Sequence, residues 1–292
     1  MEAGMMQTEW KSTRVSVNNL SLHVVEAGPA NGPLLILLHG FPEFWWAWHH
    51  QITPFADSGY HVLVPDMRGY NSSDAPPEIS SYELDTLVAD VMALADHYEA
   101  ERFHLVGHDW GGIVAWGVGA SYSHRLDRLI IMDAPHPDLM AAEILKHPTQ
   151  ALRSTYVALF QLPWLPEAAL SALDFAWLRT MLETTARPNT FKPGEIERYT
   201  EAWEHPGSLT AMLNYYRALR KRKKPDQPAR ILCPTLVLWA EKDSFLEHHV
   251  ALAALEQCDN GKLSIIQGTT HWLHLEEQER VNAEIIDFLA SK

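Results

Sequence analysis

The stretch VGHDWGG, residues 106–112, ends a mostly apolar run and places glycines on both sides of an aspartate. Small residues in this pattern are typical of a sharp turn from a strand into a helix, which exposes the central side chain at the carboxyl end of a sheet. Serine usually occupies the centre of such a turn, but here the residue is Asp109. Capping of the following helix would explain Asp109 equally well, so its partners elsewhere in the chain must decide between capping and catalysis.

Apolar segments on both sides of this turn predict the strands of one sheet. Residues 15–24 alternate apolar and polar side chains around an Asn-Asn turn, which predicts an antiparallel hairpin at the sheet edge. Residues 84–95 have the spacing of an amphipathic helix, with Ser80 and Glu83 as a capping box. Continuous apolar runs predict parallel strands covered on both faces, at residues 34–38, 61–64, 103–106, 129–132, 235–239 and 263–266.

Strands that alternate with helices predict an α/β fold with an eight-stranded, mostly parallel, doubly wound sheet. The alternation stops between residues 138 and 226, where Leu, Ala, Trp and Tyr recur at helical spacings and prolines interrupt them. We interpret residues 138–226 as a helical cap, or lid, inserted into a core made of residues 1–137 and 227–292.

Composition excludes several classes of partner. The formal net charge of −14 argues against binding to nucleic acid or to an anionic membrane, and the basic run at residues 217–224 is best explained as a solvated helix end. No apolar run has the length of a membrane span, and the first residues lack the apolar core of a signal peptide. The two cysteines have no metal-binding spacing, which fits a reducing, cytoplasmic location.

His271 lies between the last predicted strand and the last predicted helix, in the sequence GTTHW. Triads of this kind run in the order nucleophile, acid, histidine, so His271 is the expected base for Asp109. Asp133 and Asp243 both end predicted strands and both remain candidates for the acid, with Asp243 favoured by chain order. His271 and His274 lack a nearby third ligand, so we expect neither a metal nor a cofactor.

The loop LLHGFPEFWWAW, residues 37–48, follows an early strand and is placed to direct backbone N–H groups at the nucleophile. We expect the amides of Phe41 and Trp110 to form an oxyanion hole. The Phe41-Pro42 bond is a candidate cis peptide, because only X–Pro bonds adopt that form at low cost.

With LLHGFPEFWWAW, DMRGYNSSD, VGHDWGG, WAEKD and GTTHW in this order, the chain closely resembles the epoxide hydrolases of the α/β-hydrolase fold from about residue 13 to its end. The resemblance implies a lidded hydrolase with Asp109 as nucleophile, His271 as base and Asp243 as its acid. It also implies two lid tyrosines, which match Tyr156 in TYVALFQLP and Tyr216 in LNYYRAL.

The chain departs from this family pattern at three positions. Trp46 replaces a common tyrosine, Asn71 stands where glycine is usual, and Asp133 stands where asparagine is frequent, which keeps Asp133 open as an alternative acid. Dehalogenases share the HDWG turn. However, the halide-binding asparagine of the haloalkane type is Phe41 here, and Trp110 and Ile113 replace the arginines of the fluoroacetate type.

An aspartate nucleophile indicates attack on a saturated carbon. An aspartate carboxyl, with an ordinary pKa of about 3.9, is ionised at neutral pH without help from a base. It forms an ester that water can reopen, whereas serine would form a stable ether. The alkoxide that leaves an epoxide needs a proton donor, and tyrosyl hydroxyls, with a pKa of about 10, remain protonated at pH 7. The tyrosines therefore favour an epoxide over a halide.

We expect the substrate to be a small apolar epoxide, aryl or alkyl, with water as the second reactant. Tryptophans near the predicted site are candidates for the pocket wall, although ordinary core packing would also explain them: Trp45, Trp46, Trp110, Trp164 and Trp272. Haloalkane or haloacid dehalogenation is the alternative reaction, and a non-catalytic sensor of small ligands is a third possibility. We expect a monomer or a homodimer.

Overall fold

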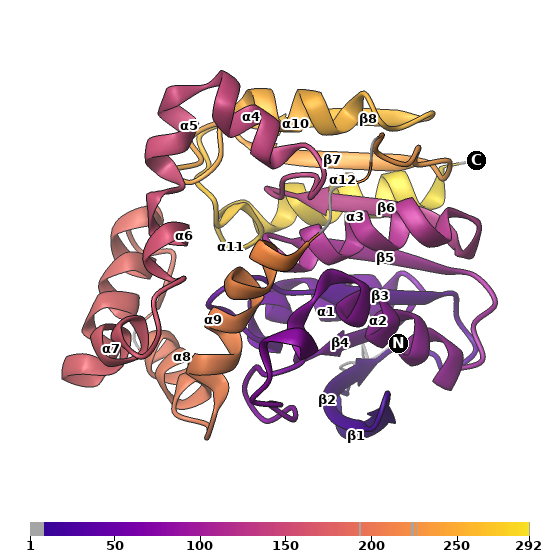
Figure 1. Ribbon diagram of the computed structural model, residues 1–292. Coiled ribbons are helices and arrows are strands. Elements are labelled where there is room, and N and C mark those ends of the chain that lie inside the picture. Colours follow the sequence, from indigo (N-terminus) through magenta and orange to yellow (C-terminus); the bar gives the residue numbers. More distant parts are fainter. Residues whose placement is uncertain (1–8, 193, 223–224, 226, 292) are drawn as a thin grey trace.

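The computed structural model describes residues 9–192, 194–222, 225 and 227–291 (Figure 1). The first eight residues, the two lysines that end the basic run and the predicted cap boundary at residue 226 therefore lie outside the described residues.

The sheet has eight strands in the order β1-β2-β4-β3-β5-β6-β7-β8. β1 and β2 form an antiparallel hairpin, β2 pairs antiparallel with β4, and all the other pairs are parallel. The predicted eight-stranded, mostly parallel sheet is thus confirmed. The strands are β1 (Lys11–Val17), β2 (Leu20–Ala27), β3 (Leu34–Leu38), β4 (His61–Pro65), β5 (Phe103–His108), β6 (Leu126–Met132), β7 (Thr235–Ala240) and β8 (Gly261–Ile266).

The β1–β2 hairpin turns on Asn18 and Asn19, whose φ values are 46° and 61°. Positive φ at both central residues is the geometry of a type I′ turn, which matches the right-handed twist of the two strands. Asparagine tolerates this conformation better than most residues because its short amide can hydrogen-bond locally. The Asn-Asn pair therefore explains why the chain reverses at this point.

Helices cover both faces of the sheet, because successive apolar residues of each inner strand point to opposite sides and both sides must be buried. On one face, α2 (Leu84–His97), α3 (Trp110–Tyr122) and α10 (His248–Leu255) pack on strand side chains such as Ile36 and Leu105. On the other face, α1 (His49–Asp57), α11 (Leu273–Glu276) and α12 (Gln278–Ala290) pack on their neighbours Leu35 and Val106.

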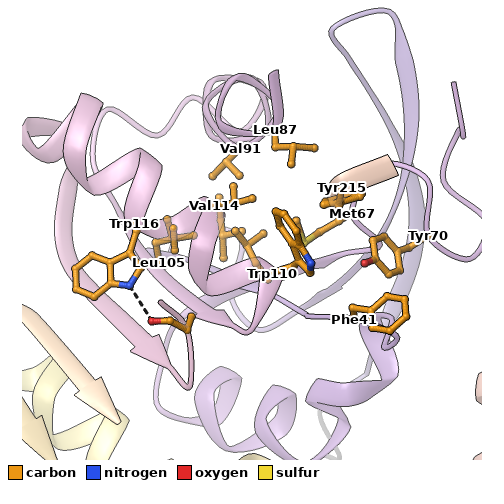
Figure 2. Close-up of a cluster of buried hydrophobic side chains, with 14 of the residues drawn as sticks. Phe41, Met67, Tyr70, Leu87, Val91, Leu105, Trp110, Val114, Trp116 and Tyr215 are labelled. Carbon is orange, nitrogen blue, oxygen red and sulfur yellow. Dashed lines mark hydrogen bonds between the residues drawn. The ribbon is translucent and has the colours of Figure 1, made fainter. Parts of the chain in front are cut away.

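Figure 2 shows part of the first of these two cores, which surrounds α3. Within it, the indole of Trp116 donates a 3.2 Å hydrogen bond to the carbonyl of Ala134. The hydrogen bond ties the middle of α3 to the loop that follows β6.

The predicted capping box of α2 is wrong. Glu83 itself is the residue before the first turn, it makes no side-chain cap hydrogen bond, and Ser80 lies in a preceding 3-10 turn, η2 (Ile79–Tyr82). The 3-10 turn brings Tyr82 into the core, where it is almost fully buried. Packing of this tyrosine thus takes precedence over a local cap.

Between β6 and β7 the described residues form helices joined by turns, and Figure 1 shows α5–α9 gathered at one end of the sheet. α7 is broken near its middle, where Leu173, Asp174 and Phe175 have positive φ. The helices are α4 (Met140–Lys146), α5 (Pro148–Arg153), α6 (Thr155–Leu159), α7 (Leu165–Thr185), α8 (Glu195–Trp203) and α9 (Ser208–Ala218).

Candidate active site

Asp109 lies in the turn between β5 and α3, with φ 49° and ψ −117°. The glycines around it are required by close backbone approach. A Cβ on Gly107 would lie 2.3 Å from the carbonyl oxygen of Gly111, and a Cβ on Gly111 would lie 2.2 Å from that of Leu38. The turn is therefore compact enough to lift Asp109 off the end of the sheet, where the first turn of α3 begins.

The two carboxylate oxygens of Asp109 have different neighbours. The amide of Phe41 donates a 2.8 Å hydrogen bond to Oδ1, because β3 and β5 are adjacent and the loop after β3 passes the turn. Oδ2 lies 3.7 Å from Nε2 of His271. The Phe41-Pro42 peptide is cis, as the sequence suggested. Trp110 is the first residue of α3, and its buried ring packs edge-on against Tyr215 and Tyr216.

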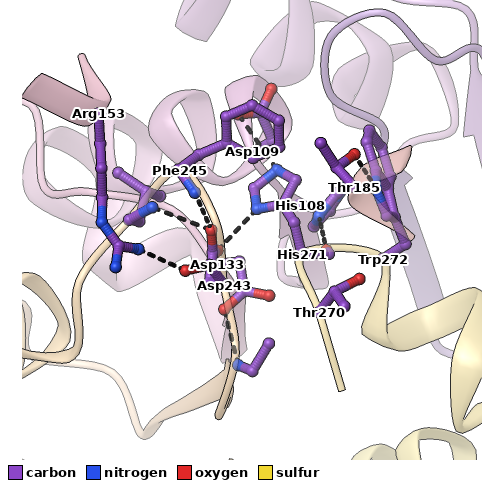
Figure 3. Close-up of polar contacts among 12 residues, drawn as sticks. His108, Asp109, Asp133, Arg153, Thr185, Asp243, Phe245, Thr270, His271 and Trp272 are labelled. Carbon is purple, nitrogen blue, oxygen red and sulfur yellow. Dashed lines mark hydrogen bonds and ion pairs between the residues drawn. The ribbon is translucent and has the colours of Figure 1, made fainter. Parts of the chain in front are cut away.

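His271 lies on the loop between β8 and α11, and its Nδ1 is 2.7 Å from Oδ2 of Asp243 (Figure 3). The other oxygen of Asp243 accepts hydrogen bonds from the amides of Phe245 and Leu246, at 2.6 and 2.9 Å. Burial disfavours the charged imidazole, but Asp243 and Asp109 outweigh it and raise the pKa of His271 well above its ordinary value. Asp243 thus orients the ring so that Nε2 faces Asp109.

Asp133, the alternative acid, follows the last residue of β6 and is fully buried. Its Oδ1 accepts a 2.8 Å hydrogen bond from the amide of Ala240, and its Oδ2 has no hydrogen-bond partner. Burial, reinforced by the nearby Asp243, raises the pKa of Asp133 well above its ordinary value. Of the two candidates, it is Asp243 that contacts the ring of His271.

Glu43, His108 and His274 form a buried group behind His271 that the sequence did not predict. Nδ1 of His108 is 3.0 Å from Oε2 of Glu43, and Nε2 of His108 is 2.9 Å from the carbonyl oxygen of His271. Burial opposes the charge on Glu43, but His274 and His108 outweigh it and hold the pKa of Glu43 below its ordinary value. Both ring nitrogens of His108 are thus occupied, one by the carboxylate of Glu43 and the other by the backbone carbonyl of His271.

This pair fixes the backbone that carries the base. His274 completes the group, with Nε2 3.4 Å from Oε1 of Glu43, and burial lowers the pKa of His274 to about 4, so the ring is neutral at pH 7. Glu43, His108 and His274 have the composition of a metal-binding set. However, both nitrogens of His108 are occupied by their hydrogen bonds, which leaves no lone pair for a metal ion. The one sequence feature that could have indicated this buried group was Glu43, the glutamate that follows HGFP.

Tyr156 on α6 and Tyr216 on α9 approach Asp109 from the helical segment. Their ring centroids are 5.9 Å apart, and both residues line the same cavity as Asp109. Burial, with the charge of Asp109 as a further cause, raises the pKa of both hydroxyls above the ordinary value of tyrosine. The adjacent Tyr215 differs, because its hydroxyl donates a 2.7 Å hydrogen bond to the carbonyl of Arg68. Both matched tyrosines are therefore protonated donors at neutral pH.

The cavity over Asp109 has a volume of about 550 Å³ and a largely apolar wall. Apart from Asp109 and the two tyrosines, side chains from the helical segment, from the start of α3 and from the loops after β6 and β7 form this wall. They include Met140, Ile144, Val157, Phe245 and Leu246.

The predicted tryptophan wall is a correction. Among the described residues, Trp110 does line the cavity, but Trp45, Trp46, Trp164 and Trp272 do not. Trp164 is 73% exposed at the start of α7, and Trp45 and Trp46 pack against Trp10 instead. Trp272 is fully buried and donates a hydrogen bond to Thr185 while its ring packs edge-on against His271. These four rings therefore pack elsewhere in the protein. Their proximity in sequence to site residues did not predict their direction, because packing sets the direction of a side chain.

Comparison with known proteins agrees with this geometry. The family profile described as "alpha/beta hydrolase fold" matches residues 33–278. The AB hydrolase superfamily protein YfhM of Bacillus subtilis is 42% identical over 278 residues, which cover 95% of this chain and 97% of that protein. Epoxide hydrolase 4 of Homo sapiens is 36% identical, over 94% of this chain and 77% of that protein.

Solved structures give the same result. A structure described under novel epoxide hydrolases of the α/β-hydrolase superfamily, from metagenomes of hot environments, has a TM-score of 0.87 and 34% identity over 97% of this chain and 100% of its own. An epoxide hydrolase from Bacillus megaterium with a bound inhibitor has a TM-score of 0.87 and 27% identity, over 96% and 100% of the two chains. The chain belongs to the α/β-hydrolase fold family. Within that family it is a member of the epoxide hydrolases.

No helix among the described residues is both long and apolar enough to cross a lipid bilayer.

Proposed function

We propose that this chain hydrolyses epoxides to vicinal diols in two steps, through an ester on Asp109. The observation that carries the proposal is the position of Asp109 between the His271–Asp243 pair and a cavity that Tyr156 and Tyr216 also line. Nucleophile, base and proton donors are thus grouped around one site where an epoxide could lie.

In the first step, Oδ2 of Asp109 attacks a carbon of the epoxide, since Oδ1 is held by the amide of Phe41. A bond forms between Oδ2 and this carbon, the carbon–oxygen bond of the ring breaks, and its electron pair moves to the epoxide oxygen. A hydroxyl of Tyr156 or Tyr216 donates a proton to that oxygen as the charge develops. The products are an ester and a neighbouring alcohol.

In the second step, His271 takes a proton from water while the water oxygen attacks Cγ of the ester. Forming the ester removes the charge of Asp109, which is one of the causes that raise the pKa of His271, so the imidazole loses one source of stabilisation for its charged form. Oδ1 carries the negative charge of the tetrahedral intermediate and is stabilised by the Phe41 amide, with the Trp110 amide as the proposed second donor. The Cγ–Oδ2 bond then breaks, and the proton returns from His271 to the leaving diol. The carboxylic acid left on Asp109 returns its proton to the tyrosinate formed in the first step, which restores the starting protonation states.

The apolar cavity supports a small aryl or alkyl epoxide as substrate, and neither step needs a cofactor. We place the helical segment over the site as a cap, because α6 and α9 supply the two tyrosines. Two buried, unpaired cysteines fit a cytoplasmic location. A monomeric or homodimeric state stays a prediction.

The decisive experiment traps the ester. His271→Gln removes the base and keeps the nucleophile, so incubation with styrene oxide should increase the intact mass of the protein by one substrate molecule. Adding Asp109→Ala to this variant should abolish the increase. Peptide mapping should place the adduct on residue 109.

Two results would contradict the proposal. One is normal epoxide turnover by Asp109→Ala together with no adduct on His271→Gln. The other is haloalkane turnover by the wild type that exceeds epoxide turnover, because this would make the chain a dehalogenase that uses the same nucleophile.

A further inference from the structure

Two histidines and a glutamate meet where α4 of the helical segment packs against α10 of the core. Glu143 and His147 lie one turn apart at the end of α4, and His249 lies in the first turn of α10. Nε2 of His147 is 3.5 Å and Nε2 of His249 is 3.7 Å from the same oxygen of Glu143, Oε2. The ligand atoms of all three residues lie within 4.8 Å of one another.

These contacts are too long for good hydrogen bonds, so hydrogen bonding does not explain why the two histidines converge on Glu143. The other oxygen of Glu143 is bound by Lys146 at 2.8 Å, whereas Nε2 of His249 is buried without a hydrogen-bond partner. The two imidazole rings stack with centroids 3.6 Å apart, which would be unfavourable if both were charged. Burial and the neighbouring His147 lower the pKa of His249, which favours the neutral ring that a metal requires.

The two nitrogen–oxygen distances are close to those between the ligands of a zinc ion. In a tetrahedral site with bonds of about 2.0–2.2 Å, two ligand atoms lie about 3.3–3.6 Å apart. The two nitrogen–oxygen separations, 3.5 and 3.7 Å, need a shift of no more than a few tenths of an ångström to reach that range. His147 is 41% exposed in its side chain, so water can reach the fourth position.

A second carboxylate lies behind one of the ligands. Nδ1 of His249 is 3.5 Å from Oε2 of Glu247, and Glu247 is held in turn by Thr149 at 3.0 Å and Arg153 at 3.4 Å. A carboxylate on the far nitrogen of a ligating histidine fixes the tautomer and increases the basicity of the ring. At 3.5 Å this contact is an electrostatic one, and the negative charge of Glu247 favours a proton on Nδ1 of His249, which leaves the lone pair of Nε2 directed at Glu143.

We propose that Glu143, His147 and His249 form a site for a divalent cation of the zinc class, with water as the fourth ligand. Two imidazoles and one carboxylate suit such borderline cations better than Ca²⁺ or Mg²⁺, which prefer oxygen ligands. The bound ion links α4 to α10. Because Met140 and Ile144 on α4 line the cavity over Asp109, the ion also anchors one wall of that cavity to the core.

The first test measures binding of Zn²⁺ alone to the chelator-treated protein by equilibrium dialysis, with Co²⁺ as a spectroscopic substitute. The wild type should bind one ion at this site and show the visible absorption of tetrahedral Co²⁺. Glu247→Gln should weaken zinc binding about 10–100-fold, as loss of a supporting carboxylate does elsewhere. His249→Ala and His147→Ala should each weaken it more and remove the Co²⁺ spectrum.

The matched control is His248→Ala, which changes the neighbour of His249 on the same helix and should bind zinc like the wild type. His271→Gln serves as a second control, because binding that survives in it does not occur at the active site. Unchanged zinc affinity in both His249→Ala and His147→Ala, with circular dichroism showing folded variants, would overturn the proposal.

The second test uses hydrogen–deuterium exchange to measure whether zinc connects α4 to α10. Zinc should slow amide exchange in α4 and α5 of the wild type and of His248→Ala, and should leave it unchanged in His249→Ala. Equal effects of zinc in all three proteins would show that it binds elsewhere.

Discussion

In the proposed mechanism, the two oxygens of Asp109 have different roles because they have different neighbours. Oδ1 accepts the hydrogen bond of the Phe41 amide, so it is already placed where the negative charge develops when water attacks the ester. Oδ2 faces His271 and the cavity, which leaves it free to attack. A carboxylate can therefore occupy a turn that usually presents serine, because one of its oxygens is held by an amide while the other stays free.

The two cavity tyrosines should control ester formation. Tyr156→Phe or Tyr216→Phe removes one donor to the epoxide oxygen, and we expect each to slow ester formation by about 10²–10⁴-fold, with near abolition in the double variant. Pre-steady-state stopped-flow fluorescence of the tryptophans, with styrene oxide in excess, would measure this step. Haloalkane turnover, if any is present, should change much less, because a departing halide needs no proton.

Tyr215 provides the matched control for Tyr216. Its hydroxyl donates to the carbonyl of Arg68, away from the reaction, so Tyr215→Phe should leave ester formation nearly unchanged. We expect it to lower the free energy of unfolding by about 0.5–1.5 kcal/mol instead. Equal slowing by Tyr215→Phe and Tyr216→Phe would argue against a specific donor role for Tyr216.

Asp243 and Asp133, the two aspartates that follow strands, should differ in their importance for turnover. Asp243→Asn removes the charge that orients His271, and turnover should fall toward the roughly 10⁴-fold loss known for a neutralised triad acid. Asp133→Asn keeps an oxygen for the Ala240 amide and should retain turnover within about tenfold of the wild type. Steady-state kinetics on both variants would test this, and a crippled Asp133→Asn beside a nearly silent Asp243→Asn would contradict the assignment.

Stability supplies an independent check on Asp133. Its pKa is raised in the folded protein, above the value of about 3.9 in an unfolded chain, so between these two values the folded state holds a proton that the unfolded chain releases. The stability contributed by this carboxyl is therefore full below about pH 4 and is lost as the pH rises toward the folded pKa. Asparagine does not titrate, so the free energy of unfolding of Asp133→Asn relative to wild type should increase as the pH rises above about 4.

The turn between β5 and α3 depends on close contact between the backbones of Gly111 and β3. Gly111→Ala places a methyl group 2.2 Å from the carbonyl oxygen of Leu38, so β3 and α3 must separate. We expect a loss of about 1–3 kcal/mol in the free energy of unfolding, with a loss of turnover as Asp109 moves away from the Phe41 amide. Denaturant unfolding and kinetics would measure both.

Ser121→Ala, at an exposed position near the other end of α3, is the matched control and should change stability by less than about 0.5 kcal/mol. If Gly111→Ala were as mild as this control, the turn would tolerate separation of β3 and α3, and the close approach would not be what positions Asp109.

The arrangement of core and helical segment as a whole should set the choice of substrate. The cavity that they enclose is about 550 Å³ and largely apolar, so it gains from burying apolar surface at about 25 cal/mol per Å². We expect kcat/KM to be higher for styrene oxide than for a small polar epoxide such as glycidol. A clear preference for glycidol would show that another surface of the protein selects the substrate.

Patterns within the sequence determined the sheet, the edge hairpin and the turn around Asp109, because each depends on neighbours along the chain. Continuous apolar runs are buried on both faces of a parallel sheet, and Asn18-Asn19 and Gly107 meet backbone demands that few other residues can satisfy. The order of Asp109, Asp243 and His271 was also visible, because chain order does not depend on distance.

Tertiary structure alone decided which distant side chains meet. Asp133 and Asp243 follow adjacent strands, and only the course of the loop after β7 brings Asp243 to within 2.7 Å of His271. The same holds for the Glu43–His108 pair behind His271 and for the four predicted tryptophans that do not line the cavity. A local pattern specifies which residues a strand or turn can hold, but the direction of a loop side chain is set by the packing of segments far apart in the sequence.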